Sequence, residues 1–201
     1  SSDVCSSDLP FAASFAMFSA GRAFEQVRNS VGYPHLNVKI AGSHAGISVG
    51  EDGATHQCCE DIALMRSIPG MVVLNPADHY EMQAAVKAAA EYVGPVYIRL
   101  GRLAVESVNN NDDYAFEIGK GITLRDGKDI TIIATGLLVQ EAVKAAKALE
   151  AAGIDARVLD IHTIKPLDTE LVLKAAQETG RIVVAEEHNV IGGLGDAVSS
   201  Y

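Results

Sequence analysis

Hydrophobic residues recur along the chain in short runs, separated by longer stretches in which they are spaced as on a helix. The short runs are apolar or β-branched and are bounded by turn residues, which is typical of buried strands. They cover residues 36–41, 71–74, 96–99, 130–134, 157–159 and 182–185. Two Ala-rich stretches between them, 80–92 and 139–152, have helical periodicity. In the second, Val139, Val143, Ala146 and Leu149 share one face.

This alternation of strands and helices predicts an α/β fold, because strand–helix–strand units form parallel sheets covered by helices. The polar segment 106–114, which runs through Asn109 to Asp113, is too polar to bury itself and is interpreted as a linker. The alternation restarts after it, where 118–124 is expected to form a short hairpin or strand pair. We therefore expect two consecutive domains, each a mostly parallel sheet with flanking helices.

The two ends of the chain differ from the rest. Residues 1–9 read SSDVCSSDL, repeat the triplet SSD and lack apolar periodicity, so they are interpreted as a tag or an artefact rather than as part of a domain. Near the other end, Gly192, Gly193 and Gly195 open a helix that stops at Tyr201 after barely two turns. We expect the chain to be a fragment of a longer protein.

Charge and cysteine content narrow the range of functions. The net charge of −10 argues against binding to nucleic acid or to an anionic membrane, since both require a basic face. No apolar run has the length of a membrane span, and the N-terminus lacks a signal peptide, so we expect a cytoplasmic location. Cys5, Cys58 and Cys59 match neither a disulfide framework nor a zinc site, and we expect free thiols and no metal.

The segment 43–57, SHAGISVGEDGATHQ, is the strongest candidate for a functional site. It places His44, Glu51, Asp52 and His56 in a glycine-rich loop directly after a predicted strand. The carboxyl ends of parallel strands are where open α/β sheets bind ligands. A surface loop with turn glycines and solvated polar groups is the plainer alternative, but this density of histidines and carboxylates favours function. The spacing fits no known metal motif.

Several motifs resemble the pyrimidine-binding domain of transketolases. These are GEDGATHQ at 50–57, DIALMRSIPGMVVLNPAD at 61–78, SFAMFSAGRAFEQVRNSV at 14–31 and PVYIRLGR at 95–102. Two others, VLDIHTIKPLD at 158–168 and EEHNVIGGLG at 186–195, are similar to a C-terminal domain that transketolases share with related enzymes. The resemblance implies a pyrimidine-binding domain at 10–105, truncated at its N-terminus, a linker at 106–114, and a transketolase C-terminal domain at 115–201, truncated at its C-terminus.

The resemblance implies thiamine diphosphate as the cofactor. Phe15 and Phe18 match the phenylalanines that hold its aminopyrimidine ring, which agrees with the preference of flat rings for aromatic contacts. Phe24 is expected to pack in the core instead. The magnesium–diphosphate motif of the family is not found in this sequence, and the glutamate that activates the pyrimidine lies upstream of the phenylalanines in the family. Mg²⁺ is therefore expected to be held by a partner subunit.

The resemblance also implies the residues that contact substrate. His44 matches a position near the sugar phosphate, Asp52 one on a sugar hydroxyl, and His56 one near the carbonyl and hydroxyls of the donor, so that Asp52 and His56 are the catalytic candidates. Arg102 matches the arginine that binds the substrate phosphate, a task suited to a planar cation. Arg99 is assigned to a structural ion pair. His35, His79, His162 and His188 are expected to be structural or solvent-exposed.

The closest resemblance is to split transketolases, enzymes of the pentose phosphate pathway whose diphosphate-binding half is a separate chain. It implies transfer of a two-carbon ketol unit between sugar phosphates, an N-terminal partner subunit, and self-association across the cofactor interface. The alternatives are a deoxyxylulose-phosphate synthase, the beta subunit of a 2-oxo-acid dehydrogenase, and a non-catalytic assembly module.

Overall fold

A computed structural model describes residues 9–109 and 114–201. Cys5, residues 1–8 of the predicted non-domain segment and residues 110–113 of the predicted linker lie outside the described residues. The strands are β1 (Phe11–Phe15), β2 (Lys39–Ser43), β3 (Val72–Leu74), β4 (Val96–Arg99), β5 (Ile122–Arg125), β6 (Ile130–Ala134), β7 (Ala156–Asp160), β8 (Thr163–Lys165) and β9 (Ile182–Ala185). The helical segments are η1 (Met17–Arg22), α2 (Phe24–Gln26), η2 (Val27–Gly32), η3 (Gly50–Asp52), α3 (Asp61–Ser67), α4 (His79–Glu91), α5 (Leu138–Ala151), α6 (Thr169–Thr179) and α7 (Leu194–Ser199).

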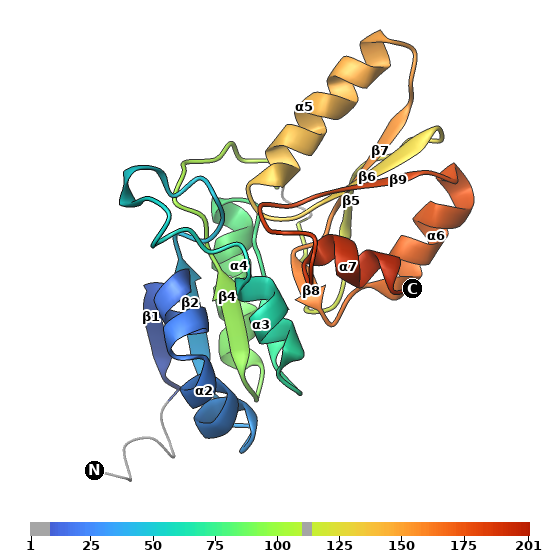
Figure 1. The fold of residues 1–201 in the computed structure, drawn as a ribbon. Helices are drawn as coiled ribbons and strands as arrows, with labels where there is room; N and C mark the ends of the chain where they lie inside the picture. The colour runs from blue at the N-terminus through green and yellow to red at the C-terminus, as the bar shows by residue number, and fades with distance from the viewer. Residues whose placement is uncertain (1–8, 110–113) are drawn as a thin grey trace.

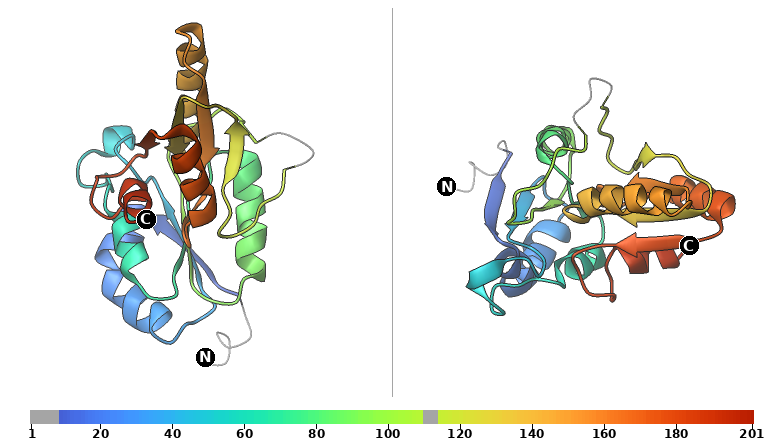
Figure 2. Two further views of the ribbon diagram at one scale, coloured as in Figure 1. Left: turned by 90° about the vertical axis from the view of Figure 1, so that its right-hand side faces the viewer. Right: turned by 90° about the horizontal axis from the view of Figure 1, so that it is seen from above.

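The first sheet has the strand order β1-β2-β4-β3-β8 (Figure 1). Its first four strands are parallel, and β8, which comes from the second half of the chain, runs antiparallel to β3. Side chains alternate between the two faces, as the pleat requires. Val72, Leu74, Val96 and Ile98 pack with α4, whereas Val73 belongs to the core on the other face. Figure 2 shows α4 on one side of the sheet and the helices α2 and α3 on the other.

The second sheet has the order β5-β7-β6-β9, with β7, β6 and β9 parallel and β5 antiparallel to β7. Ile132 and Val158 pack with α5 on one face. Ile133 and Leu159, the next residues along the same strands, face the core that contains residues of α6 and α7. The predicted α/β class with two mostly parallel sheets is therefore confirmed.

One hydrophobic core joins the two halves of the chain. It contains Ile40 and Tyr97 of the first sheet together with Ile133, Leu159 and Ile164 from the second half, all of them buried. Because this cluster is continuous, the two sheets are not independent bodies connected only by a linker. Phe24 packs against the same core, as predicted.

Some elements differ from the sequence-based expectation. β2 begins at Lys39 rather than at residue 36, and the expected hairpin at 118–124 is a single strand, β5, paired with β7. β1 was not among the predicted strands, because its sequence FAASF is rich in small residues. β8 was not predicted either, because its sequence TIK has a single apolar residue and therefore forms no apolar run.

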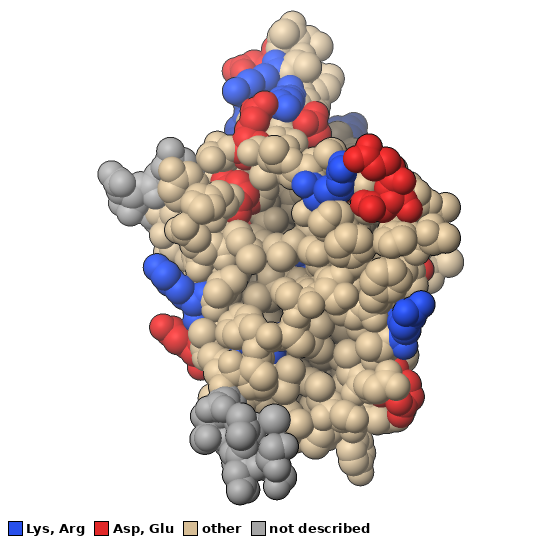
Figure 3. All heavy atoms as spheres, turned by 90° about the vertical axis from the view of Figure 1, so that its left-hand side faces the viewer, with Lys and Arg blue, Asp and Glu red and all other residues tan. Residues whose placement is uncertain are grey.

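The β1 edge of the first sheet is uncovered in the described part of the chain. Phe11, Ala12, Ala13 and Ser14 are exposed. Ala12, Ala13 and Ser14 line an apolar groove together with Phe18 and Val27. Figure 3 shows this side of the molecule, where charged side chains lie mainly around the rim and the centre is uncharged. Separately, no helix among residues 9–109 and 114–201 is long and apolar enough to cross a membrane.

Candidate active site

Four aromatic side chains meet at the carboxyl ends of β1 and β2. Phe15 ends β1, and its ring stacks on that of His44, which follows β2, with 4.2 Å between the ring centroids. The rings of Phe15 and Phe18 are parallel at 6.1 Å. His56 approaches both edge-on, at 5.6 Å from Phe15 and 5.2 Å from Phe18. The structure thus gathers these four predicted site residues into one cluster at the sheet edge where ligands bind.

The loop between the two histidines is closed at its base. Gly46 N–H donates to the carbonyl of Cys58 at 2.8 Å, and Cys58 N–H donates back to Gly46 at 3.3 Å. His44 itself has a positive φ of 58°, a conformation that is uncommon outside glycine but that histidine, like asparagine and aspartate, adopts more often than other residues. This turn directs the chain out of β2 and into the loop. The imidazole Nδ1 of His44 lies 3.2 Å from Ser43 Oγ.

Asp52 lies on the turn that follows, and Arg102, which comes after β4, contacts this turn through Glu51. Asp52 ends the short helix η3 and is exposed, and Gly50 and Gly53 on either side of it have φ values of 74° and 73°. Arg102 Nη2 pairs with Glu51 Oε1 at 3.1 Å, and the arginine side chain is 33% exposed. A partly exposed cation therefore stands beside the loop. The structure brings Arg102 to Glu51 and records no hydrogen bond or ion pair from Asp52 to the aromatic cluster.

Arg99 has a different environment, because it is enclosed at the end of β4. Its Nε pairs with Asp61 Oδ2 at 2.9 Å, and its side chain is only 3% exposed. Tyr97 Oη donates to the same carboxylate oxygen at 2.9 Å. Burial opposes the charge on Arg99, but the Asp61 carboxylate outweighs it and raises the pKa of the guanidinium. The prediction that Arg99 makes a structural ion pair is confirmed.

The remaining histidines differ in burial: His35 and His79 are exposed, His188 is half-buried and His162 is buried. His162 is buried against Phe116, with ring centroids 4.1 Å apart, and burial lowers its pKa to about 4, so it is neutral. Cys58 and Cys59 are free, as expected. Burial raises the pKa of the Cys58 thiol to about 12, which rules out a reactive thiolate there.

Sequence reasoning missed the contribution of the second half of the chain to this site. Glu187 and Asn189, in the loop between β9 and α7, reach the base of the loop that carries His44 and His56. The only sequence signal for this contribution was that both residues lie in the segment EEHNVIGGLG. That segment resembles the C-terminal domain of transketolases and related enzymes, but the resemblance gives no role to either residue.

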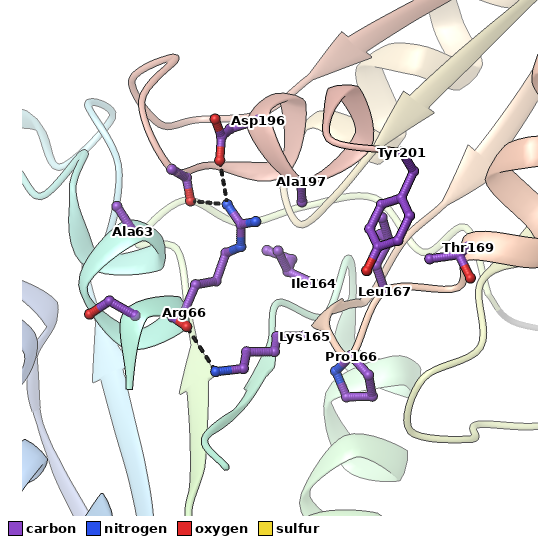
Figure 4. Close-up of a pocket in the computed structure, with 12 residues that line it drawn as sticks. Ala63, Arg66, Ile164, Lys165, Pro166, Leu167, Thr169, Asp196, Ala197 and Tyr201 are labelled. Atoms are coloured by element: carbon purple, nitrogen blue, oxygen red, sulfur yellow. Dashed lines mark hydrogen bonds and ion pairs between the residues drawn. The ribbon is translucent and has the colours of Figure 1, made fainter. Parts of the chain in front are cut away.

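Away from this cluster, a cavity of about 670 Å³ lies between α3, β8, α6 and α7 (Figure 4). Its cations already have protein partners. Arg66 Nη1 donates to the carbonyls of Gly192 and Gly193 and pairs with Asp196 at 3.2 Å. Lys165 Nζ donates to the carbonyls of Arg66 and Ile68. These side chains hold the two halves of the chain together.

The residues present fit part of thiamine diphosphate. The parallel rings of Phe15 and Phe18 offer a flat aromatic surface to a pyrimidine. For the magnesium ion, no group of three or more histidine, cysteine, aspartate or glutamate side chains in the described parts of the chain is arranged to hold a metal.

Two family models match the chain. Residues 5–107 match the transketolase pyrimidine-binding domain, and residues 119–201 match the transketolase C-terminal domain. A relative from Methanocaldococcus jannaschii, described as a putative transketolase C-terminal section, is 53% identical over 192 residues, which are 95% of this chain and 60% of that protein. A 1-deoxy-D-xylulose-5-phosphate synthase of Heliobacterium modesticaldum is 43% identical over 88% of this chain and 27% of its own length.

The fold is also found among solved structures. A protein described as a split gene transketolase, inactive beta4 tetramer, superposes with a TM-score of 0.89 and 55% identity, over 96% of this chain and 62% of that chain. The chain therefore spans about 60% of the length of this relative and of this solved structure. The sequence, the two domain matches and the fold agree, and the chain belongs to the transketolase family.

Proposed function

We propose that the chain is the C-terminal part of a thiamine-diphosphate-dependent transketolase, which transfers a two-carbon ketol unit between sugar phosphates. The observation that carries this proposal is the cluster of Phe15, Phe18, His44 and His56, with Arg102 paired to Glu51 on the adjoining turn. It combines an aromatic surface, two imidazole rings and a partly exposed cation. Those are the groups that a flat cofactor, a sugar and a phosphate require.

The cofactor would rest with its aminopyrimidine ring on Phe15 and Phe18. Thiamine diphosphate supplies the carbon nucleophile that carries the two-carbon unit, which no side chain can replace. The Mg²⁺ ion and the diphosphate are assigned to the partner subunit. The role of this chain is to orient the cofactor ring and the sugar.

Four side chains of the loop and its surroundings would bind the sugar. His44 donates a hydrogen bond toward the phosphate end, and Arg102 pairs with the phosphate itself. Asp52 accepts from a sugar hydroxyl, and His56 lies near the carbonyl and hydroxyls of the donor, where it can take up or release a proton. Asp52 and His56 are therefore the proposed catalytic residues.

The domain division and the partner belong to the same proposal. We assign residues 10–105 to the pyrimidine-binding domain, 106–114 to a linker and 115–201 to the C-terminal domain. The partner would be an N-terminal subunit with the diphosphate-binding domain, and the complex would self-associate across the cofactor interface in the cytoplasm. Support comes from a relative described as a C-terminal section and from a beta4 tetramer described as inactive. The uncovered β1 edge is consistent with a partner.

A deoxyxylulose-phosphate synthase is the second candidate, favoured by 43% identity to one such enzyme. It differs in its donor, because it attaches a decarboxylated pyruvate rather than a ketol unit. The higher identity to a transketolase section favours the first candidate.

The test is to express the protein that carries this chain with and without the proposed diphosphate-binding subunit. With thiamine diphosphate and Mg²⁺, we expect transfer from a ketose phosphate to an aldose phosphate only in the mixture, since this chain lacks the metal motif. Ketose turnover by the protein alone would contradict the partner requirement. Consumption of pyruvate instead of a ketose would identify the synthase, and no turnover in either sample would favour an assembly module.

A further inference from the structure

The loop that carries the proposed substrate residues is held in place by hydrogen bonds from the second half of the chain. We propose that Glu187 is a positioning residue, whose carboxylate fixes the backbone of the loop between His44 and Asp52. This inference deepens the proposed function and rests on it for the role of the loop. The contacts that support it all lie within this chain.

The Glu187 carboxylate lies directly under the loop backbone. Ser48 N–H donates to Glu187 Oε1 in a short hydrogen bond. Gly46 has a φ of 92°, and a Cβ placed on it would lie 2.2 Å from Glu187 Cδ. The loop can pass over the carboxylate at this distance only because Gly46 has no side chain. Glu187 is 8% exposed, so its charge is largely withdrawn from water and directed at the loop.

Glu187 is itself held in place. Its carbonyl accepts a hydrogen bond from Arg99 Nη2 at 2.7 Å, and Arg99 is anchored by its ion pair with Asp61. Asn189 Nδ2 donates to the carbonyl of Cys59 at 2.6 Å, and Asn189 N–H donates to the same atom at 3.1 Å. The carboxylate therefore projects from a backbone that is fixed to both β4 and the end of the loop.

The N–H group of Ser48, which Glu187 restrains, lies in the loop that carries the proposed site residues. Ser48 stands midway in sequence between His44 and Asp52, and the bridge between Gly46 and Cys58 closes the loop beside it. Glu187 makes no hydrogen bond or ion pair with His44, Asp52 or His56, so it acts on them only through the loop backbone. A charge-assisted hydrogen bond to a backbone N–H is among the stronger restraints that a side chain can give.

The experiment compares Glu187→Ala, Glu187→Gln and the matched control Glu186→Ala. Glu186 is the preceding carboxylate, but it accepts from Leu194 N–H and Gly195 N–H and so acts within the second half of the chain. Hydrogen exchange of peptides covering 44–59 should become about tenfold or more faster in Glu187→Ala. Glu187→Gln, which keeps an oxygen for Ser48 N–H, should restore most of the protection. Glu186→Ala should affect peptides around 194–199 instead.

The kinetic readout uses the partnered enzyme. Glu187→Ala should lower kcat/KM for the ketose phosphate by about tenfold or more, with little change in the concentration of thiamine diphosphate that half-saturates the enzyme, and Glu187→Gln should recover most of it. Unchanged loop exchange in Glu187→Ala, or equal loosening in Glu186→Ala, would overturn the proposal. If Glu187→Ala does not fold, Glu187→Asp decides, because it withdraws the carboxylate from Ser48 and must also speed loop exchange. If loop exchange is faster in Glu187→Ala but the partnered protein does not transfer a ketol unit, the proposed function is wrong and the positioning role of Glu187 still holds.

Discussion

Arg99 and Arg102 lie close in sequence, yet the structure gives them opposite environments. Arg99 is enclosed and pairs with the buried Asp61, whereas Arg102 is partly exposed and pairs with the exposed Glu51. An exposed ion pair of this kind contributes little to stability and is easily exchanged for another anion. These environments support the proposal that Arg102, rather than Arg99, binds the substrate phosphate.

Replacing Arg102 with alanine should remove the phosphate contact from the partnered enzyme. A charge-assisted contact of this kind is worth about 2 to 4 kcal/mol, so the KM for phosphorylated sugars should rise by roughly 30-fold or more. The KM for hydroxypyruvate, which has no phosphate, should barely change. Steady-state kinetics with both donors measures the difference. Equal losses for both donors, or a larger phosphate-selective loss in Arg99→Ala, would show that the assignment of the phosphate to Arg102 is wrong.

At the residue scale, the sequence predicted side chains near the strand ends better than it predicted their supports. His44, His56, Phe15 and Phe18 were singled out, and the structure gathers them. Glu187 was not singled out, because its contact with Ser48 joins positions that are far apart in sequence. A contact between remote segments leaves no periodic pattern in one sequence.

Among the elements, α4 carries the most unusual polar environment. Its N-cap Asp78 accepts from Glu81 N–H at 3.0 Å through one oxygen and from Val108 N–H at 2.7 Å through the other. Glu81, also buried, accepts from Ala77 N–H at 2.6 Å and from Tyr114 Oη at 2.7 Å. This end of the helix therefore secures the segments on both sides of residues 110–113 to the first sheet.

The acidic residues of this cluster should make stability depend on pH. Burial raises the pKa of Glu81 to about 7, and burial together with the nearby Glu81 raises that of Asp160. An unfolded glutamate titrates near about 4.3. Between these two pH values the folded protein holds a proton that the unfolded chain has lost. Stability should therefore fall as the pH rises from about 4 through 7, and it should not recover above 7.

Glu81→Gln removes this titration while keeping the shape of the protonated side chain. We expect the melting temperature of the variant relative to the unsubstituted protein to increase from pH 5 to about pH 7 and to level off above that pH, since the amide carries no charge to bury. Thermal unfolding at several pH values measures it. Glu91→Gln, at the exposed end of the same helix, is the control and should show no such trend. A constant difference across the pH range would contradict the raised pKa.

The elements themselves were predicted unevenly. β4, β6 and β9 have the expected bounds, because continuous β-branched and apolar runs are typical of strands. β1 is an exposed edge strand and β8 has a single apolar residue, so neither carries the pattern that identifies a strand. β8 also pairs with β3 in the sheet that the first half of the chain forms, a topology that no local pattern contains.

For the whole molecule, the pairing of β8 with β3 changes how the two halves relate. The sequence predicted two domains separated by a polar linker, which would allow each to unfold alone. The structure instead extends the first sheet with a strand from the second half, and one buried cluster contains residues of both sheets. The free energy of packing is therefore shared between the halves.

We expect the protein to unfold in a single transition, and Ile164→Ala to shift that transition as a whole. Ile164 is in β8, is 1% exposed and belongs to the shared core, so truncating it should cost about 2 to 5 kcal/mol and lower the melting temperature by roughly 4 to 20 °C. Differential scanning calorimetry should show one peak before and after the substitution, with the calorimetric enthalpy close to the van 't Hoff enthalpy. Val183→Ala is the matched control, because Val183 is a β-branched residue in β9 that is 50% exposed, and its loss should change the melting temperature only slightly. Two separate peaks, with only one of them moved by Ile164→Ala, would mean that the halves unfold independently and that the β8 contact does not couple them.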